Sequence, residues 1–157
     1  MAAREHRGQM IKQIIDESLT TKTVKQVIGN EKINLAVLKE KNISYSILIP
    51  TETGLNKGIM DAVSGVREFL RINNIHDYDS QKFGPDNKVK LIGKFCNRDK
   101  DIQTEISLYR SNGRGDYRIW YSELKTFVNA NEEIALIYKD DIINVLNLSR
   151  IDYSKVL

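Results

Sequence analysis

The spacing of apolar residues predicts helices at the start of the chain. Apolar side chains recur at helical spacing over residues 9–19, which indicates an amphipathic helix. Thr23 can cap a second, shorter helix, and Gly29-Asn30 is a residue pair at which such a helix would stop. The first 30 residues are therefore expected to form a helical extension of the main domain.

The period of the pattern then changes from helical to alternating. Apolar and polar positions alternate over residues 33–38 and again over residues 45–49, with a polar break between them, which is typical of a β-hairpin. Pro50 has no amide hydrogen for a strand ladder, so the second strand would end there. Apolar residues at steps of three and four from Leu55 to Leu70 predict one continuous helix, which Thr51 or Thr53 would cap.

The second half of the chain has the pattern of short strands separated by turns. Residues 73–85 are polar and rich in turn formers, so we expect a loop there. Strands are predicted over residues 88–96, 103–110, 117–121, 133–138 and 141–148, with a short helix over residues 122–129. This order of elements predicts an α+β fold in a single domain over residues 1–157, built on a small open β-barrel of about seven short strands.

Composition narrows the function mainly by exclusion. The chain is 41% hydrophobic and 29% charged, and it has no apolar run near the ~20 residues that cross a bilayer. The one cysteine, Cys96, cannot form an internal disulfide, and no signal-peptide core follows Met1, so we expect a cytoplasmic protein. The usual motifs of nucleotide hydrolysis, dinucleotide binding, ester hydrolysis and zinc chemistry are absent. We therefore expect no cofactor.

Positive charge is concentrated in the middle of the chain. Residues 82–118 carry nine Lys and Arg against five Asp and Glu, although the net charge of the whole chain is only +3. Within this stretch, the segment Ser107–Trp120 places three arginines and an asparagine around a glycine-rich turn between two strands. Arginine can bond guanine bidentately, asparagine can do the same for adenine, and a two-stranded ribbon fits the major groove. We therefore predict a protein that binds double-stranded DNA sequence-specifically.

Eight side chains are the candidates for DNA contacts. The candidates for base contacts are Arg110, Asn112, Arg114 and Arg118, and those for phosphate contacts are Lys94, Arg98, Lys100 and Lys57. Large apolar residues that alternate or recur along the later elements are assigned to the core rather than to base stacking. These core residues are Trp120, Phe127, Leu136 and Tyr138.

The main alternative is a small metal-dependent nuclease. The spacing matches that of PD-(D/E)xK nucleases at Asp116, Glu123 and Lys125. In such nucleases carboxylates hold a divalent cation and a lysine lies near the attacking water. Mg²⁺ would be the cofactor only in this case. Glu123 also follows a serine at a predicted helix start, where the helix dipole explains a glutamate equally well. A third class, a protein-interaction domain, predicts no salt-sensitive affinity for duplex DNA.

One stretch resembles a known family of DNA-binding domains. Residues 118–138 run from an aromatic-containing strand through a short helix with Leu124, Phe127 and Val128 to an apolar strand. This arrangement resembles the DNA-binding pseudobarrel, which is shared by plant B-three transcription-factor domains and the N-terminal effector domain of the restriction endonuclease EcoRII. A looser resemblance over residues 49–120 is to regions attached to restriction endonucleases of the MvaI and BcnI type.

The resemblance implies an open barrel whose two arms grip the major groove. One arm would lie near Thr51–Lys57 or Lys94–Lys100, and the other near Arg110–Arg118. It also implies a non-catalytic effector or target-recognition domain of a restriction system, with a nuclease domain or subunit as a possible partner. The chain departs from the family at Asn131-Glu132-Glu133, where the family commonly carries Gly-Asp before the last strand.

Overall fold

The computed structural model describes residues 21–157, with side chains from Gly29 onward. It divides into two compact units, which are described separately. One unit is Ile43–Asn147, and the described part of the other combines residues 21–42 with Leu148–Leu157. The helix predicted over residues 9–19 lies outside the described residues. Within residues 21–157, no helix combines the length and the apolar character needed to cross a membrane.

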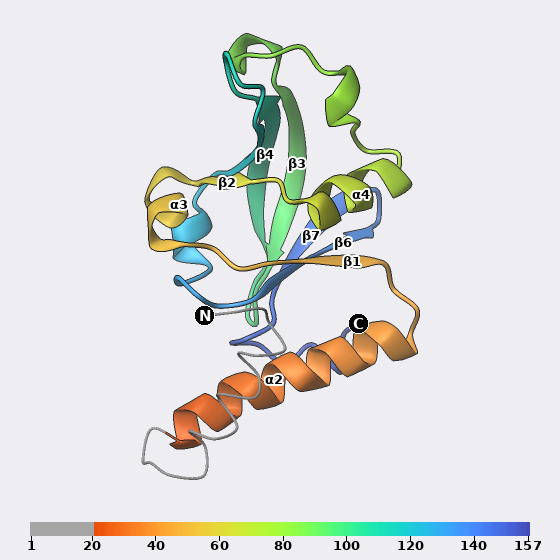
Figure 1. Cartoon of the computed structure of the whole chain (residues 1–157). Coiled ribbons are helices and arrows are strands. Elements are labelled where there is room, and N and C mark those ends of the chain that lie inside the picture. The colour runs from red at the N-terminus through yellow and green to blue at the C-terminus, as the bar shows by residue number, and fades with distance from the viewer. Residues whose placement is uncertain (1–20) are drawn as a thin grey trace. The chain divides into compact units, whose positions relative to one another are not determined.

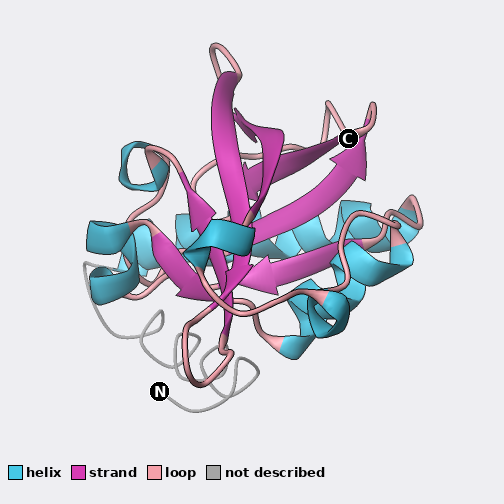
Figure 2. Ribbon diagram, turned by 90° about the horizontal axis from the view of Figure 1, so that it is seen from above, coloured by secondary structure: helices cyan, strands magenta, loops and turns pink. Residues whose placement is uncertain are grey.

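The larger unit is built on a curled sheet of seven strands (Figures 1 and 2). The order across the sheet is β1-β6-β7-β3-β4-β5-β2, and all neighbours are antiparallel except β3 and β7. The strands are β1 (Tyr45–Leu48), β2 (Ile59–Asp61), β3 (Val89–Cys96), β4 (Ile102–Arg110), β5 (Tyr117–Tyr121), β6 (Ile134–Lys139) and β7 (Ile142–Asn147). The predicted α+β class is confirmed, as are the five strands predicted in the second half, each within two residues at either end.

Short helices accompany the sheet. They are α3 (Glu52–Lys57), α4 (Ser64–Ile72) and three turns of 3₁₀-helix, η1 (Tyr78–Ser80), η2 (Pro85–Asn87) and η3 (Leu124–Thr126). The helix predicted over residues 122–129 is thus reduced to the single turn η3. The loop predicted over residues 73–85 is confirmed, with η1 inside it.

The continuous helix predicted from Thr51 or Thr53 to Leu70 is wrong. Thr51 caps α3 as expected, since its hydroxyl accepts a hydrogen bond from the Gly54 amide at 3.0 Å. The helix ends at Gly58, which has a left-handed φ of 71° that glycine adopts readily. The next three residues form β2 along the edge of β5, with Ile59 opposite Trp120. The gain of strand pairing there prevails over the helical spacing of the apolar residues.

The hairpin strand predicted over residues 33–38 is also wrong, because this segment belongs to the helix α2 (Thr21–Glu40) of the smaller unit. Gly29-Asn30 and Thr23 lie inside α2 and do not bound it. The buried residues of the segment are Asn34 and Leu38, one helical turn apart. The Asn34 side chain donates to the carbonyls of Leu148 and Ile151 and accepts from the Tyr153 amide, so it satisfies three backbone groups of the C-terminal segment.

The core of the larger unit lies on the inner face of the curled sheet. The Phe95 and Phe127 rings stack there at 4.8 Å between centres, and Leu136 is fully buried. The core assignments of Phe127 and Leu136 are therefore confirmed. Those of Trp120 and Tyr138 are wrong, since Trp120 is half-buried and Tyr138 is 37% exposed.

Candidate nucleic-acid interface

The glycine-rich segment forms an ordered turn between β4 and β5, and we call residues 111–116 the β4–β5 turn. The Ser111 amide donates to the Asp116 carbonyl at 2.9 Å, and the Ser111 hydroxyl accepts from the Asp116 amide at 2.9 Å. The Gly115 amide donates to the Ser111 carbonyl at 3.0 Å. Gly113 and Gly115 have φ of 75° and 69°, so the two glycines allow the left-handed backbone that closes the turn.

The preceding loop supports this turn from one side. Phe83 forms a parallel bridge with Arg110, and the Gly84 amide donates to the Arg110 carbonyl at 2.7 Å. The Phe83 ring covers Gly115 so closely that a Cβ on Gly115 would lie 2.3 Å from it. Asn112 rests in the same way on Gly84. The loop therefore holds the turn in one position relative to the sheet.

Arg110 is part of this support. Its guanidinium lies 4.5 Å from the centre of the Phe83 ring and 4.7 Å from that of Tyr117, and its Nε donates to the Gly115 carbonyl at 2.9 Å. A second guanidinium, that of Arg67, lies 4.2 Å from the Tyr117 ring centre. Such cation–π contacts are strongest for partly desolvated groups. The guanidinium of Arg110, which was predicted to contact a base, thus contacts residues of the turn and its support instead.

Asn112 and Arg114 are the predicted readers that the turn displays to solvent. Asn112 is exposed, and the Arg114 side chain is 85% exposed. The nearest carboxylate to the Arg114 guanidinium is Asp116, at the long distance of 3.8 Å. An exposed ion pair of this kind stabilises by well under 1 kcal/mol. The Arg114 guanidinium is therefore available to a ligand.

Arg118 has a third environment, because it lies on the outer face of the sheet and is already paired. One of its terminal nitrogens lies 2.6 Å from an oxygen of Asp61 on β2, and the other lies 3.1 Å from an oxygen of Asp116. Its side chain is only 32% exposed. The two carboxylates neutralise this arginine, so its attraction for a phosphate or a base is weaker than that of an unpaired arginine.

The predicted phosphate contacts lie away from the β4–β5 turn. We call residues 97–101 the β3–β4 tip; it contains Arg98 and Lys100 and lies at the other end of β4 (Figure 1). The nine residues of β4 span ~30 Å, which separates the two ends. Lys94, beside the tip, forms an ion pair with Asp101 at 3.3 Å. Lys57 is exposed at the end of α3. The carbonyl of the next residue, Gly58, accepts a hydrogen bond from the amide of Tyr121, the last residue of β5, so Lys57 lies at the end of β5 opposite to the β4–β5 turn.

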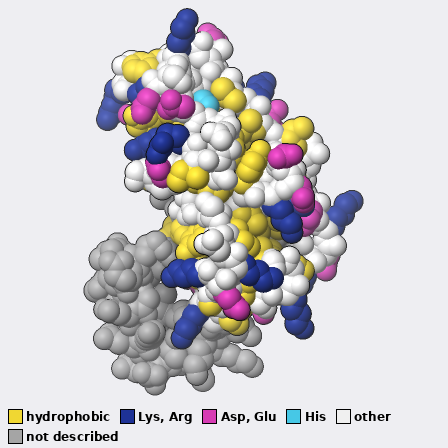
Figure 3. All heavy atoms as spheres, turned by 90° about the vertical axis from the view of Figure 1, so that its right-hand side faces the viewer, with side chains coloured by type: hydrophobic (Ala, Val, Ile, Leu, Met, Phe, Trp, Pro, Cys, Tyr) yellow, Lys and Arg dark blue, Asp and Glu magenta, His cyan; other side chains and the backbone are white. Residues whose placement is uncertain are grey.

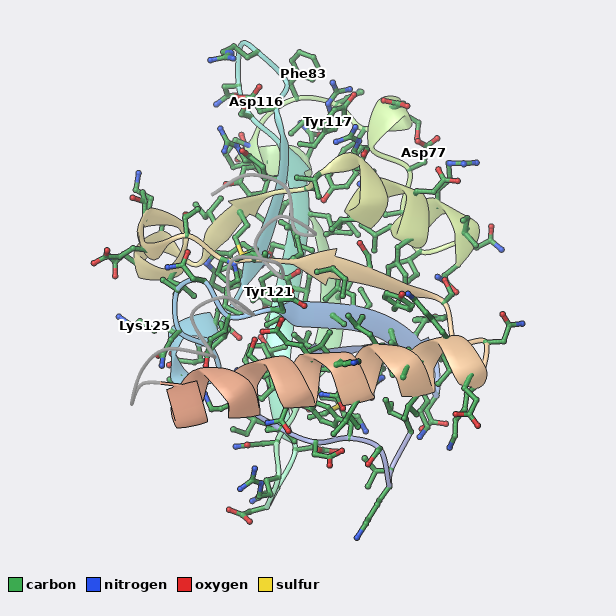
Figure 4. All side chains as sticks on the ribbon, turned by 60° about the horizontal axis from the view of Figure 1, so that its bottom comes forward. Asp77, Phe83, Asp116, Tyr117, Tyr121 and Lys125 are labelled. Carbon is green, nitrogen blue, oxygen red and sulfur yellow. The ribbon has the colours of Figure 1, made fainter. Side chains whose placement is uncertain are left out.

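The nuclease candidates are not brought together. Asp116 precedes the five residues of β5, whereas Glu123 and Lys125 follow them, which places the groups ~16 Å apart along the strand. Figure 4 shows Asp116 with Phe83 and Tyr117, and Lys125 well away from them. Among the residues that the structure describes, no group of three or more His, Cys, Asp or Glu side chains could hold a metal ion.

One face of the sheet carries a feature that the sequence reasoning missed. A surface pocket of about 250 Å³, which we call the outer-face pocket, lies over β2, β5, β4 and β3. It is lined by Ile59, Pro85, Lys88, Lys90, Glu105, Ser107, Tyr109 and Trp120. The signal was present in the alternation of β4, where Glu105, Ser107 and Tyr109 share one face. It was overlooked because Trp120 was assigned to the core.

Charges of both signs are interspersed on one face of the molecule. The face shown in Figure 3 carries basic and acidic side chains side by side, with no extended patch of one sign. Long-range attraction of a polyanion to this face would therefore be weak.

The fold and the geometry of these sites place the larger unit in the class of small α+β domains with a curled, half-barrel sheet. No protein-family model, curated protein or solved structure matches the chain.

Proposed function

We propose that this chain is a sequence-specific double-stranded DNA-binding module. The observation that carries the proposal is the β4–β5 turn, in which Asn112 and Arg114 are presented on a backbone held by the Arg110, Phe83 and Tyr117 side chains. A reader works best when its base-contacting groups are positioned before binding, because little conformational entropy is then lost on association.

The two-stranded form of the turn is compatible with major-groove binding. A two-stranded antiparallel ribbon is narrow enough to enter the groove, which is about 12 Å wide in B-DNA. Arg114 can bond O6 and N7 of guanine, and Asn112 can bond N6 and N7 of adenine. We assign base contacts to these two residues, and we assign Arg110 and Arg118 to positioning the turn and its flanking strand.

The resemblance of residues 118–138 to the DNA-binding pseudobarrel supports the same proposal. The curled seven-stranded sheet is compatible with that fold. On this basis we propose that the module acts as an effector or target-recognition domain of a restriction system, with a nuclease domain or subunit as its partner. Its cations at the β3–β4 tip would then form a second contact, with phosphates.

Selection from a randomised duplex pool tests the proposal. The full chain is incubated with the pool in magnesium at moderate salt, the retarded DNA is sequenced, and the pool is examined for cleavage. We expect a short enriched motif without cleavage. A parallel selection with the Asn112→Ala, Arg114→Ala double variant should lose the motif. A pool that is not retarded at all would overturn the proposal, and cleavage by the chain would favour the nuclease instead.

A further inference from the structure

The outer-face pocket combines groups that bind nucleotides. Four of its residues form one row across neighbouring strands, because Lys90 is opposite Ser107, Ser107 is opposite Trp120, and Trp120 is opposite Ile59. Tyr109 lies one position along the same face, beside Lys88. Two aromatic side chains and two lysines therefore border one pocket.

The Trp120 indole packs against the backbone at one side of this pocket. The edge of its indole ring packs on Gly58, where an added Cβ would lie 2.9 Å from Nε1 and 3.1 Å from Cδ1. The residue is half-buried, so part of the ring remains accessible. A partly exposed indole that packs on backbone along one edge is a suitable surface for stacking a planar base.

The lysines supply positive charge beside these rings. The Lys88 ammonium lies 5.9 Å from the centre of the Tyr109 ring, and Lys88 and Lys90 are both exposed. Neither lysine forms an ion pair with a carboxylate of the described residues, in contrast to Lys94 and Arg118. Their charge is available to an anion. Two neighbouring cations beside aromatic rings suit a phosphate attached to a base.

The volume of the pocket and the Glu105 carboxylate restrict the class of ligand further. At about 250 Å³ the pocket is smaller than the ~300 Å³ at which ordinary small-molecule sites begin, so it admits one base rather than an extended cofactor. The Glu105 carboxylate at the pocket can accept a hydrogen bond from an exocyclic amine, the contact that acidic side chains make with N4 of cytosine.

We propose that the outer-face pocket binds one unpaired nucleotide of single-stranded DNA. The base stacks against Trp120 and Tyr109, the phosphates contact Lys88 and Lys90, and Glu105 favours a base with an amino group. This site is separate from the β4–β5 turn and does not depend on duplex recognition there. It would give the chain a second mode of DNA binding on the face of the sheet.

The sole tryptophan of the chain reports on this pocket directly, since Trp120 is that residue. Trp120 emission of the full chain is followed during titration with single-stranded oligodeoxycytidine about 10 nucleotides long. We expect saturable quenching, tighter for oligodeoxycytidine than for oligothymidine. Tyr109→Leu should weaken binding about tenfold through lost stacking. Lys90→Gln should reduce the salt dependence of binding by about 0.7 in the slope of log K against log salt.

Controls separate this proposal from the previous one. Lys139→Gln, at an exposed lysine of β6 outside the pocket, should bind like the unmodified chain. Circular dichroism of Tyr109→Leu checks that the variant is folded. The proposal is overturned if single strands leave Trp120 emission unchanged, if polyphosphate quenches it equally, or if folded Tyr109→Leu binds normally. Retardation of duplex DNA without a change in Trp120 emission would leave the proposed function intact.

Discussion

The two turns at the ends of β4 have similar charge but different construction. The β4–β5 turn is tied by hydrogen bonds within itself, covered by Phe83 and supported by Arg110. The β3–β4 tip consists of five exposed residues, and its described contacts include an Asn97 side chain that accepts from the Arg98 amide and the ion pair of Lys94 with Asp101. Two turns that contain Lys or Arg and carry no net charge can therefore differ in how firmly their backbone is held.

The difference in construction determines which cations can provide sequence specificity. Reading a base requires a guanidinium held in the correct direction, whereas a phosphate contact tolerates a mobile side chain. The β4–β5 turn meets part of the first requirement, because Arg114 extends from an ordered backbone while its guanidinium stays exposed. The exposed cations of the β3–β4 tip are suited to the second. If the comparison is correct, substitutions that remove the support of the first turn will lower stability, and loss of Arg114 will change sequence preference. Substitutions at the β3–β4 tip will weaken binding to all sequences alike and reduce its dependence on salt.

The largest effect is expected from Arg110→Leu. The substitution removes the contacts with both aromatic rings and the hydrogen bond to Gly115, so the free energy of unfolding should fall by about 2–3 kcal/mol. Urea denaturation measures it. The matched variant at the other turn, Lys100→Leu, should change stability by less than about 0.5 kcal/mol. Equal effects of the two substitutions would contradict the comparison.

Two glycine substitutions separate the contribution of the Phe83 contact to stability from the cost of a left-handed backbone. Gly113→Ala meets no atom within 4 Å and should cost only about 1 kcal/mol for its positive φ. Gly115→Ala has the same backbone cost and must also displace the Phe83 ring, so we expect about 2 kcal/mol in total. Thermal unfolding of both variants measures the difference. If Gly115→Ala is no worse than Gly113→Ala, Phe83 does not hold the turn.

The elements that could be predicted from the sequence are those that depend on local interactions. Short strands and turns in the second half follow local rules of alternation and turn chemistry, and they were predicted closely. The break at Gly58 and the helical state of residues 33–38 were missed, because pairing of β2 with β5 and the burial of Asn34 depend on residues far away in the sequence. Local pattern could not show these competing interactions.

The candidate site was predicted in composition but not in geometry. The sequence located the glycine-rich turn, yet it could not show that Arg110 faces the aromatic rings and Arg118 faces Asp61, since side-chain partners come from separate segments. Of the four predicted base readers, Asn112 and Arg114 are left exposed. The role of Trp120 was missed for the same reason.

Arg114→Ala tests whether the ordered turn reads bases. We expect a loss of about 1–3 kcal/mol in binding to the selected duplex, little change on unrelated duplexes, and no change in stability, because the side chain is mostly exposed. Fluorescence anisotropy with both duplexes measures the affinities. Arg98→Ala at the β3–β4 tip should weaken binding to the two duplexes equally. An equal loss on both duplexes for Arg114→Ala would make Arg114 a phosphate contact.

The smallest effect is expected at the β3–β4 tip, from Lys100→Gln. Lys100 is exposed, and a single phosphate contact releases about one counterion, so the slope of log K against log salt should become shallower by about 0.9 for duplex DNA. Sequence preference and unfolding should stay unchanged. Affinities at a series of salt concentrations measure the slope, with Lys139→Gln as the matched control. A change in sequence preference on Lys100→Gln would show that the tip is ordered on DNA, and the distinction between the two turns would fail.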